Sequence, residues 1–138
     1  PARPIQSAAA KLYRNTAMLE EYFEDLDKRI EDRMSILKNR LGAMRNFGVN
    51  YVEPEGGIYL STQFDLFNLL DCNSNEEIRS WLLEEAGVAV VPFQAFGLEA
   101  DTGWFRISIG AVSVEDIVGA MDRLDSALKI ATAHEHDA

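Results

Sequence analysis

Apolar residues recur at alternating steps of three and four between positions 19 and 44, which is the spacing of one face of an α-helix. The positions are Leu19, Phe23, Leu26, Ile30, Met34, Leu37, Leu41 and Met44. Two glutamates lie near the start of the segment and two arginines near its end, so both placements suit the helix dipole. With Gly48 as a stop signal, the pattern predicts one continuous helix over about 16–46.

The predicted length of this helix is comparable to the size of a whole domain. About thirty residues at ~1.5 Å rise make a rod of ~45 Å, whereas a compact globule of this size has a diameter somewhat under ~40 Å. Either the domain is slightly elongated, or one end of the helix packs on something outside this chain. The pattern leaves both possibilities open. A shorter alanine-rich helix over 5–13 precedes the long one.

After the long helix, the apolar period changes to the two-residue alternation of strands. Four short strands are predicted, over 49–52, 58–61, 88–91 and 104–109. One further helix follows a capping box at Ser74 and ends at Gly87, and a last helix starts at Ser113. This order indicates an α+β fold, a two-layer sandwich in which helices cover a small mixed or antiparallel sheet of three to four strands.

The charge balance excludes some classes of partner. The chain has 13 Lys and Arg against 23 Asp and Glu, a formal net charge of −10. Nucleic acid and anionic membrane surfaces are bound by clustered Lys and Arg, which so acidic a chain lacks. No apolar run approaches the ~18 residues of a membrane span. We therefore expect neither nucleic acid nor a membrane as a partner.

Few side chains in the sequence are candidates for a nucleophile or a metal ligand. The single cysteine, Cys72, cannot form an internal disulfide, which fits a reducing compartment such as the cytoplasm. Its acidic neighbours would raise the pKa of the thiol rather than activate it. His134 and His136 could hold a metal ion in principle, but imidazoles on a fraying end are more often disordered, so we expect no metal site.

The stretch WFRISI, residues 104–109, is a predicted strand with one arginine in it. Alternation turns its side chains to two opposite faces. One face carries Phe105, Ile107 and Ile109, and the other carries Trp104, Arg106 and Ser108. The apolar face should pack on the helices, so that Arg106 points to solvent, a cleft or another domain. Two interpretations stay open: a structural ion pair with one of the carboxylates, or a receptor for a carboxylate ligand, which guanidinium binds bidentately.

The segment before this strand, PFQAFG at 92–97, is rich in aromatic side chains. Phe93 and Phe96 either cover the core or form the apolar rim of a ligand site beside the charge of Arg106. An apolar rim next to a charge is a common composition of ligand pockets.

Four pieces of the chain taken in order resemble a known family. EPEGGIYL, LLEEAGVAVVP, AFG and GWFRISIG, followed by a capped amphipathic helix, are similar to the carboxy-terminal small domain of fold-type I pyridoxal-phosphate-dependent aminotransferases of class I/II. The family pattern is a P-x-G-G-aromatic turn, a G-V-x-V-x-P-G strand and loop with a downstream F-G, and an R-[IL]-[SN] strand. The resemblance extends over about residues 3–128, and it implies that the long helix leaves a large domain and enters this small one.

The resemblance also implies roles for individual residues. Arg106 matches the arginine that binds the substrate α-carboxylate and orients the amino acid towards the cofactor. Gly57 matches a tight turn into a core strand, and Pro92 and Phe96 match the loop that lines the site. Phe93 departs from the pattern, because the family commonly has glycine after this proline. Its ring would narrow or reshape the substrate pocket.

By this resemblance the chain is the small domain of an amino-acid aminotransferase, which closes over the active site. The implied cofactor is pyridoxal 5'-phosphate, held mainly by the large domain, and the implied partners are an amino acid, a 2-oxo acid, the large domain and a second copy in a homodimer. The family's Schiff-base lysine lies in an S-x-S-K-like context. None of the four lysines here has it: Lys11, Lys28, Lys38 and Lys129. We therefore expect no catalytic residue in this chain and no transamination by the isolated chain.

The chain opens PAR without an initiator methionine, which fits an excised fragment. On this interpretation residues 1–15 are a short helix left from the junction with the large domain, residues 16–131 are the small domain, and residues 132–138 are a disordered tail. The alternative is a self-standing acidic α+β binding or regulatory domain that recognises a small carboxylate or a protein partner.

Overall fold

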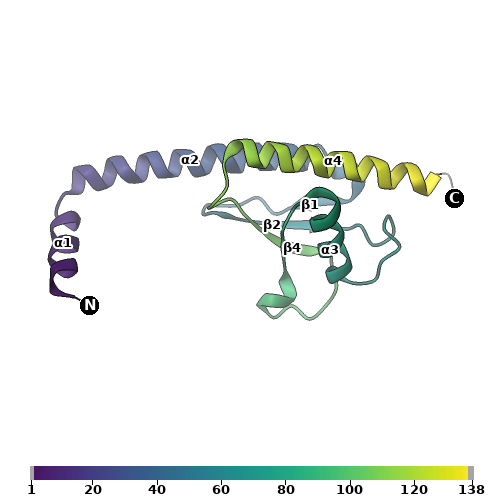
Figure 1. Cartoon of the computed structure of the whole chain (residues 1–138), viewed down its shortest axis with the longest axis horizontal. Coiled ribbons are helices and arrows are strands. Elements are labelled where there is room, and N and C mark those ends of the chain that lie inside the picture. The colour runs from purple at the N-terminus through teal and green to yellow at the C-terminus, as the bar shows by residue number, and fades with distance from the viewer. Residues whose placement is uncertain (1, 137–138) are drawn as a thin grey trace.

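The computed structural model of the chain describes residues 2–136, and the side chains of residues 2–133. The helices, in chain order, are α1 (Arg3–Tyr13), α2 (Thr16–Gly42), α3 (Asn75–Ala86) and α4 (Val114–His136), with two short 3-10 helices, η1 (Arg45–Phe47) and η2 (Phe93–Phe96). The strands are β1 (Val49–Tyr51), β2 (Tyr59–Phe64), β3 (Val91–Pro92) and β4 (Trp104–Ser108). Figure 1 shows these elements along the chain. The predicted α+β class is confirmed.

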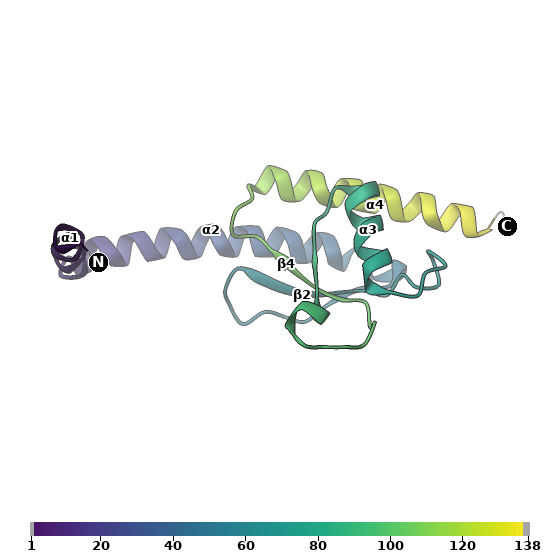
Figure 2. The same cartoon turned by 60° about the horizontal axis from the view of Figure 1, so that its bottom comes forward.

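The four strands form one sheet in the order β1-β2-β4-β3, and all three strand pairs are antiparallel. Of the two sheet types that the sequence allowed, mixed or antiparallel, the structure therefore has the antiparallel one. The long helices α2 and α4 lie along one face of this sheet (Figure 2). The element η2 and the loop after it lie away from that helical layer, so the fold is the predicted two-layer sandwich with one sheet face left open.

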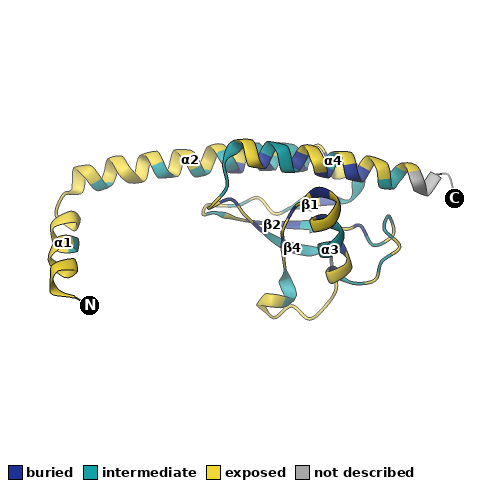
Figure 3. Ribbon diagram, viewed as in Figure 1, coloured by how far each residue is buried: buried dark blue, intermediate teal, exposed yellow. Residues whose placement is uncertain are grey.

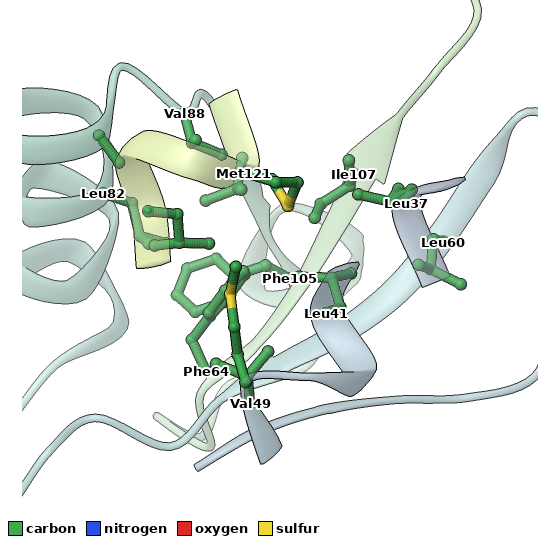
Figure 4. Close-up of a cluster of buried hydrophobic side chains, with 14 of the residues drawn as sticks. Leu37, Leu41, Val49, Leu60, Phe64, Leu82, Val88, Phe105, Ile107 and Met121 are labelled. Atoms are coloured by element: carbon green, nitrogen blue, oxygen red, sulfur yellow. The ribbon is translucent and has the colours of Figure 1, made fainter. Parts of the chain in front are cut away.

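The core lies between the helices and the sheet, and it is built from α2, α3, α4 and the strands β1, β2 and β4 (Figure 4). Leu37 and Leu41 come from α2, and Phe64 and Phe105 come from neighbouring strands with their ring centres 5.9 Å apart. All four side chains are almost fully buried, and burying each contributes ~1.5–3 kcal/mol relative to leaving it in water. The four apolar positions predicted for the last helix are also buried: Ile117, Met121, Leu124 and Leu128.

The predicted helix boundaries need two corrections. The long helix ends at Gly42 rather than at 46, and the chain continues through the separate helix η1 to Gly48, whose φ of +87° makes it the left-handed stop. At the other terminus, α4 continues to His136, so residues 132–136 are helical and not the predicted disordered tail. No glycine or proline interrupts this segment, so the last helix has no breaker there. Positions 137–138 of that predicted tail lie outside the described residues.

The strand predicted over 88–91 was also placed too early, because only Val91–Pro92 pairs with β4. Gly87 adopts a left-handed φ of +64°, and the backbone N–H of Val88 donates to the carbonyl of Leu82 at 3.0 Å. That hydrogen bond closes the carboxy-terminal cap of α3, so Val88 still belongs to the end of the helix. Val88 and Val90 are nevertheless buried in the core, as their apolar character predicted.

Helix α1 and the first half of α2 extend away from the main body (Figures 1 and 3). No residue of α1 is buried, and the buried residues of α2, Met34, Leu37 and Leu41, all lie in its last third. The apolar stripe is therefore open along this arm, where the exposed large apolar side chains are Ile5, Leu12, Tyr13, Met18, Tyr22 and Phe23. No helix within residues 2–136 is both long enough and apolar enough to cross a membrane.

Candidate functional site

Strand β4 separates its side chains between the core and the open face of the sheet. Phe105, Ile107 and the following Ile109 are buried at 0%, 8% and 1% exposure, whereas Trp104 and Arg106 are half-buried and Ser108 is exposed. The alternation predicted from WFRISI is confirmed. It places Arg106 on the face opposite the helices, so that no charge is buried in the core.

Arg106 lies in the middle of this open face, between two neighbouring strands. It is directly opposite Ser61 of β2 on one side and Val91 of β3 on the other. Its guanidinium carbon lies 4.3 Å from the ring centre of Tyr59 and 4.2 Å from that of Phe96. Tyr59 belongs to β2 and Phe96 follows β3, so the two rings reach the guanidinium from opposite sides of β4.

Among residues 2–133, no carboxylate is paired with the charge of Arg106. The ion pairs among residues 2–133 join other side chains: Arg29–Asp25, Lys38–Glu53, Arg40–Asp122, Arg79–Glu76 and Lys129–Asp125. Of the two interpretations that the sequence left open, a structural ion pair is therefore not found in this part of the chain. A guanidinium held by aromatic faces keeps its in-plane N–H groups available, and these are the groups that bind a carboxylate bidentately.

The other predicted pocket residues fall into two places. Pro92 pairs with Phe105 at the edge of the sheet, and the ring of Phe93 lies 6.1 Å from that of Phe96 and 6.3 Å from that of Trp104. The bulky Phe93 thus joins an aromatic cluster beside Arg106. Gly57 lies apart from this cluster in the turn before β2, with a φ of +80° that favours glycine.

Gly57 lines a groove of about 550 Å³ between that turn and α2, where Met34, Lys38 and Glu55 are among the other lining residues. The groove lies on the helical side of the molecule. The structure therefore does not bring Gly57 into contact with Arg106, and its link to the site is through Tyr59, two residues further along the chain.

Sequence reasoning missed Tyr59 as a neighbour of the arginine. The tyrosine was visible in the GGIY turn motif, but only the strand register places it beside Arg106. Ser61 pairs with Arg106, and Tyr59 lies two residues before Ser61, on the same face of β2. A prediction of the β2–β4 register would have found it.

Other titratable groups do not assemble into a second reactive centre. The pKa of the Cys72 thiol is raised, first by partial burial and then by Glu77 and Asp71, so the thiolate is disfavoured, as its acidic neighbours predicted. No three His, Cys, Asp or Glu residues in the described part of the chain cluster so as to hold a metal ion. The side chains of His134 and His136 lie outside that part.

The lysines do not fit an anchor for a covalently bound cofactor. Lys38 is paired with Glu53, and the hydrogen bond that its amine donates to the Glu53 carboxylate raises the pKa of the amine, which keeps it protonated. Lys129 is paired with Asp125 on α4, and Lys11 and Lys28 lie exposed on the arm of α1 and α2. None of the four is on a strand of the sheet that carries Arg106.

The sequence model described as "Aminotransferase class I and II" matches residues 2–124, which is most of the chain. This chain belongs to the class I and II aminotransferase family. Among its relatives are the aromatic-amino-acid aminotransferase 2 of Thermococcus litoralis, 34% identical over 129 residues, and an aspartate aminotransferase of Pyrococcus horikoshii, 35% identical over 106 residues. The aligned parts cover 94% and 77% of this aminotransferase chain.

A solved structure agrees with this assignment. The aromatic aminotransferase from Pyrococcus horikoshii OT3 superposes with a TM-score of 0.72 and 27% identity over 95% of this chain. The aminotransferase chain described here spans 32% of that protein, and 31% and 25% of the two relatives above. It therefore corresponds to a quarter to a third of the length of each of these three proteins.

Proposed function

We propose that this chain is the carboxy-terminal small domain of a pyridoxal-phosphate-dependent amino-acid aminotransferase, and that Arg106 binds the α-carboxylate of the amino-acid and 2-oxo-acid substrates. The observation that carries the proposal is the guanidinium of Arg106, held between Tyr59 and Phe96 on the open face of the sheet. Membership of the aminotransferase family supports the class of reaction. The position of Arg106 supports the role of this chain in that reaction, which is to bind the substrate carboxylate.

The two rings prepare Arg106 for a carboxylate. Contacts with the π faces restrain the guanidinium, so less side-chain freedom is lost when the ligand binds. Each ring also covers part of the guanidinium and reduces its contact with water, which strengthens an ion pair formed with its N–H groups. Phe93 and Trp104 extend this apolar rim towards the substrate side chain. The chain thereby binds and orients the substrate.

The chemical step would then depend on residues of the rest of the enzyme. The pairing of Lys38 and Lys129 supports an isolated chain that does not transaminate. The open stripe on α1 and α2 supports an arm that is covered by the large domain, or by the second copy of a homodimer, and it favours this function over a self-standing binding domain. We place the parent enzyme in the cytoplasm, which fits one unpaired cysteine.

The test uses the full-length enzyme and two pairs of amino donors. L-phenylalanine is compared with 2-phenylethylamine, and L-aspartate with β-alanine, because the second of each pair lacks the α-carboxylate. Arg106→Ala should lower kcat/KM for the amino acids by a factor on the order of tens to hundreds, with little change for the amines. Arg106→Lys should lose much of the same activity, because a point charge does not reproduce the planar fork.

Arg45→Ala is the matched control, since the guanidinium carbon of Arg45 also lies over an aromatic ring, 5.8 Å from the centre of Tyr51, away from the proposed site. It should leave all four rates unchanged. An unchanged kcat/KM of Arg106→Ala for both amino acids would overturn the proposal. So would an equal loss for amino acids and amines, because that pattern reports general damage and not carboxylate binding.

A further inference from the structure

The ring of Phe96 beside Arg106 belongs to a segment with very little backbone support. The strand that leads into it, β3, has only two residues, and one of them is Pro92, which has no N–H to donate. After η2, residues 97–101 are exposed. A short edge strand and an exposed loop do not by themselves fix a side chain at 4.2 Å from a guanidinium.

Side-chain hydrogen bonds supply the missing support, and they converge on Gln94 of η2. The amide oxygen of Gln94 accepts from Nδ2 of Asn75 at 2.8 Å. Its Nε2 donates to Oδ1 of Asp101 at 2.9 Å and to the carbonyl of Ala100 at 3.2 Å. These contacts use both ends of the Gln94 amide and reach two separate segments, the start of α3 and the loop at Ala100 and Asp101, so the position of the amide is well defined.

Asn75 connects this amide to the body of the domain. It is the first residue of α3 and only 1% exposed. Its Oδ1 accepts from the N–H of Gly103 at 2.8 Å, and its own backbone N–H donates to Oδ1 of Asp101 at 2.7 Å. A buried amide is retained where its hydrogen bonds are satisfied, and here both ends of the Asn75 side chain are used.

The network therefore joins three segments: the start of α3, the helix η2, and the loop that enters β4 at Gly103. Phe96 is two residues from Gln94 on η2, and Arg106 is three residues from Gly103 on β4. The same set of hydrogen bonds thus fixes one aromatic partner of the guanidinium relative to the strand that carries the guanidinium.

We propose that Asn75 and Gln94 are positioning residues for carboxylate binding: through Asp101 and Gly103 they hold Phe96 against Arg106. This inference rests on the proposed function, because it concerns the efficiency of the same arginine. Neither residue touches the guanidinium. Their effect on the substrate passes through the Phe96 ring, which restrains Arg106 and keeps water from one of its faces.

The decisive experiment is a double-mutant cycle in the full-length enzyme, with L-phenylalanine and 2-phenylethylamine as donors. Gln94→Ala is the primary variant, since Gln94 is only half-buried and its removal leaves the core intact. It should raise KM for L-phenylalanine about three- to tenfold, change kcat far less, and leave the amine almost unaffected. Phe96→Leu, which keeps an apolar side chain but no π face, should give the same pattern.

In the Arg106→Ala background, Gln94→Ala should have almost no further effect on L-phenylalanine, because the group that it positions is gone. Glu99→Gln is the control on the same exposed loop and should behave as the wild type. If Arg106→Ala lowers kcat/KM but Gln94→Ala leaves KM unchanged, or acts equally in both backgrounds, the positioning role is overturned while the proposed function stands. If Arg106→Ala itself has no effect, the proposed function fails first.

Discussion

Phe105 and Arg106 are adjacent in strand β4, and their side chains face opposite layers of the molecule. Phe105 is fully buried against Phe64 and the helices, whereas the guanidinium of Arg106 lies on the open face between Tyr59 and Phe96. The strand thereby contributes to the core through one face and presents a cation through the other. Stability and the proposed substrate binding are thereby assigned to two neighbouring residues.

This separation predicts that substitutions at the two positions lower the free energy of unfolding by different amounts. Phe105→Ala should lower the free energy of unfolding by ~3–5 kcal/mol, because it leaves a cavity in the core. Arg106→Ala should cost at most ~1–2 kcal/mol, the loss of two partly exposed cation–π contacts. Urea unfolding of the chain, followed by circular dichroism, measures both values. Equal destabilisation by the two substitutions would contradict the separation of roles.

Gly103 should tolerate no side chain, because of both its backbone conformation and its surroundings. Its φ is +71°, and a Cβ atom there would lie 2.6 Å from the carbonyl oxygen of Phe64. Gly103→Ala should therefore destabilise the chain by at least ~1–3 kcal/mol. Gly42→Ala is the matched control, since a Cβ there meets nothing within 4 Å and the residue is helical. It should be neutral or stabilising by up to ~1 kcal/mol. Thermal unfolding that ranks the two variants alike would refute this expectation.

The amino-terminal cap of α3 should make stability depend on pH. The Ser74 hydroxyl donates to the Glu77 carboxylate at 2.7 Å, and the backbone N–H of Asn73 donates to the same carboxylate at 3.0 Å. These hydrogen bonds lower the pKa of Glu77. A carboxyl group whose pKa is lower in the folded state stabilises the fold at pH values above its unfolded-state pKa of ~4.3. This stabilisation is lost as the pH falls through the pKa of the folded state.

Glu77→Gln should therefore be less stable than the wild type at neutral pH, and the difference should shrink towards zero in acid. Urea unfolding of both proteins at neutral and strongly acidic pH tests this. Ser74→Ala should raise the pKa of Glu77 towards its ordinary value, as measured by NMR titration. A stability difference between wild type and Glu77→Gln that stays constant across the pH range would exclude the cap as its source.

The open stripe on α1 and α2 should make the isolated chain self-associate, because contiguous exposed apolar surface favours burial against another surface. Phe23, 52% exposed on α2, stacks edge-to-face on Tyr22 and lies within this stripe. Phe23→Ser should lower the average mass in sedimentation equilibrium. Ile130→Ser, at a 60% exposed position on α4 away from the stripe, should not. If the wild-type chain stayed strictly monomeric at high concentration, this would argue against the proposal that α1 and the start of α2 are covered in the parent enzyme.

Several predictions from the sequence failed only at the ends of elements. The sequence located the four α-helices, although not the two short 3-10 helices, and Ser74, Gly87 and Ser113 cap helices as expected, because capping depends on residues within one turn. The strand predicted over 88–91 was misplaced because a run of apolar residues fits a helix cap followed by a buried loop as well as a strand. Only pairing with β4 decides between them, and pairing is a tertiary contact.

By itself, the sequence determined that Phe105 faces the core and Arg106 faces away from it, since alternation along a strand is local geometry. The tertiary structure alone decided what surrounds the arginine. Tyr59, Phe96 and the Asn75–Gln94–Asp101 network come from separate segments, and they meet through strand register and through side-chain hydrogen bonds that have no periodic signature in the chain. Local periodicity specifies which face a residue occupies, but long-range pairing specifies its neighbours.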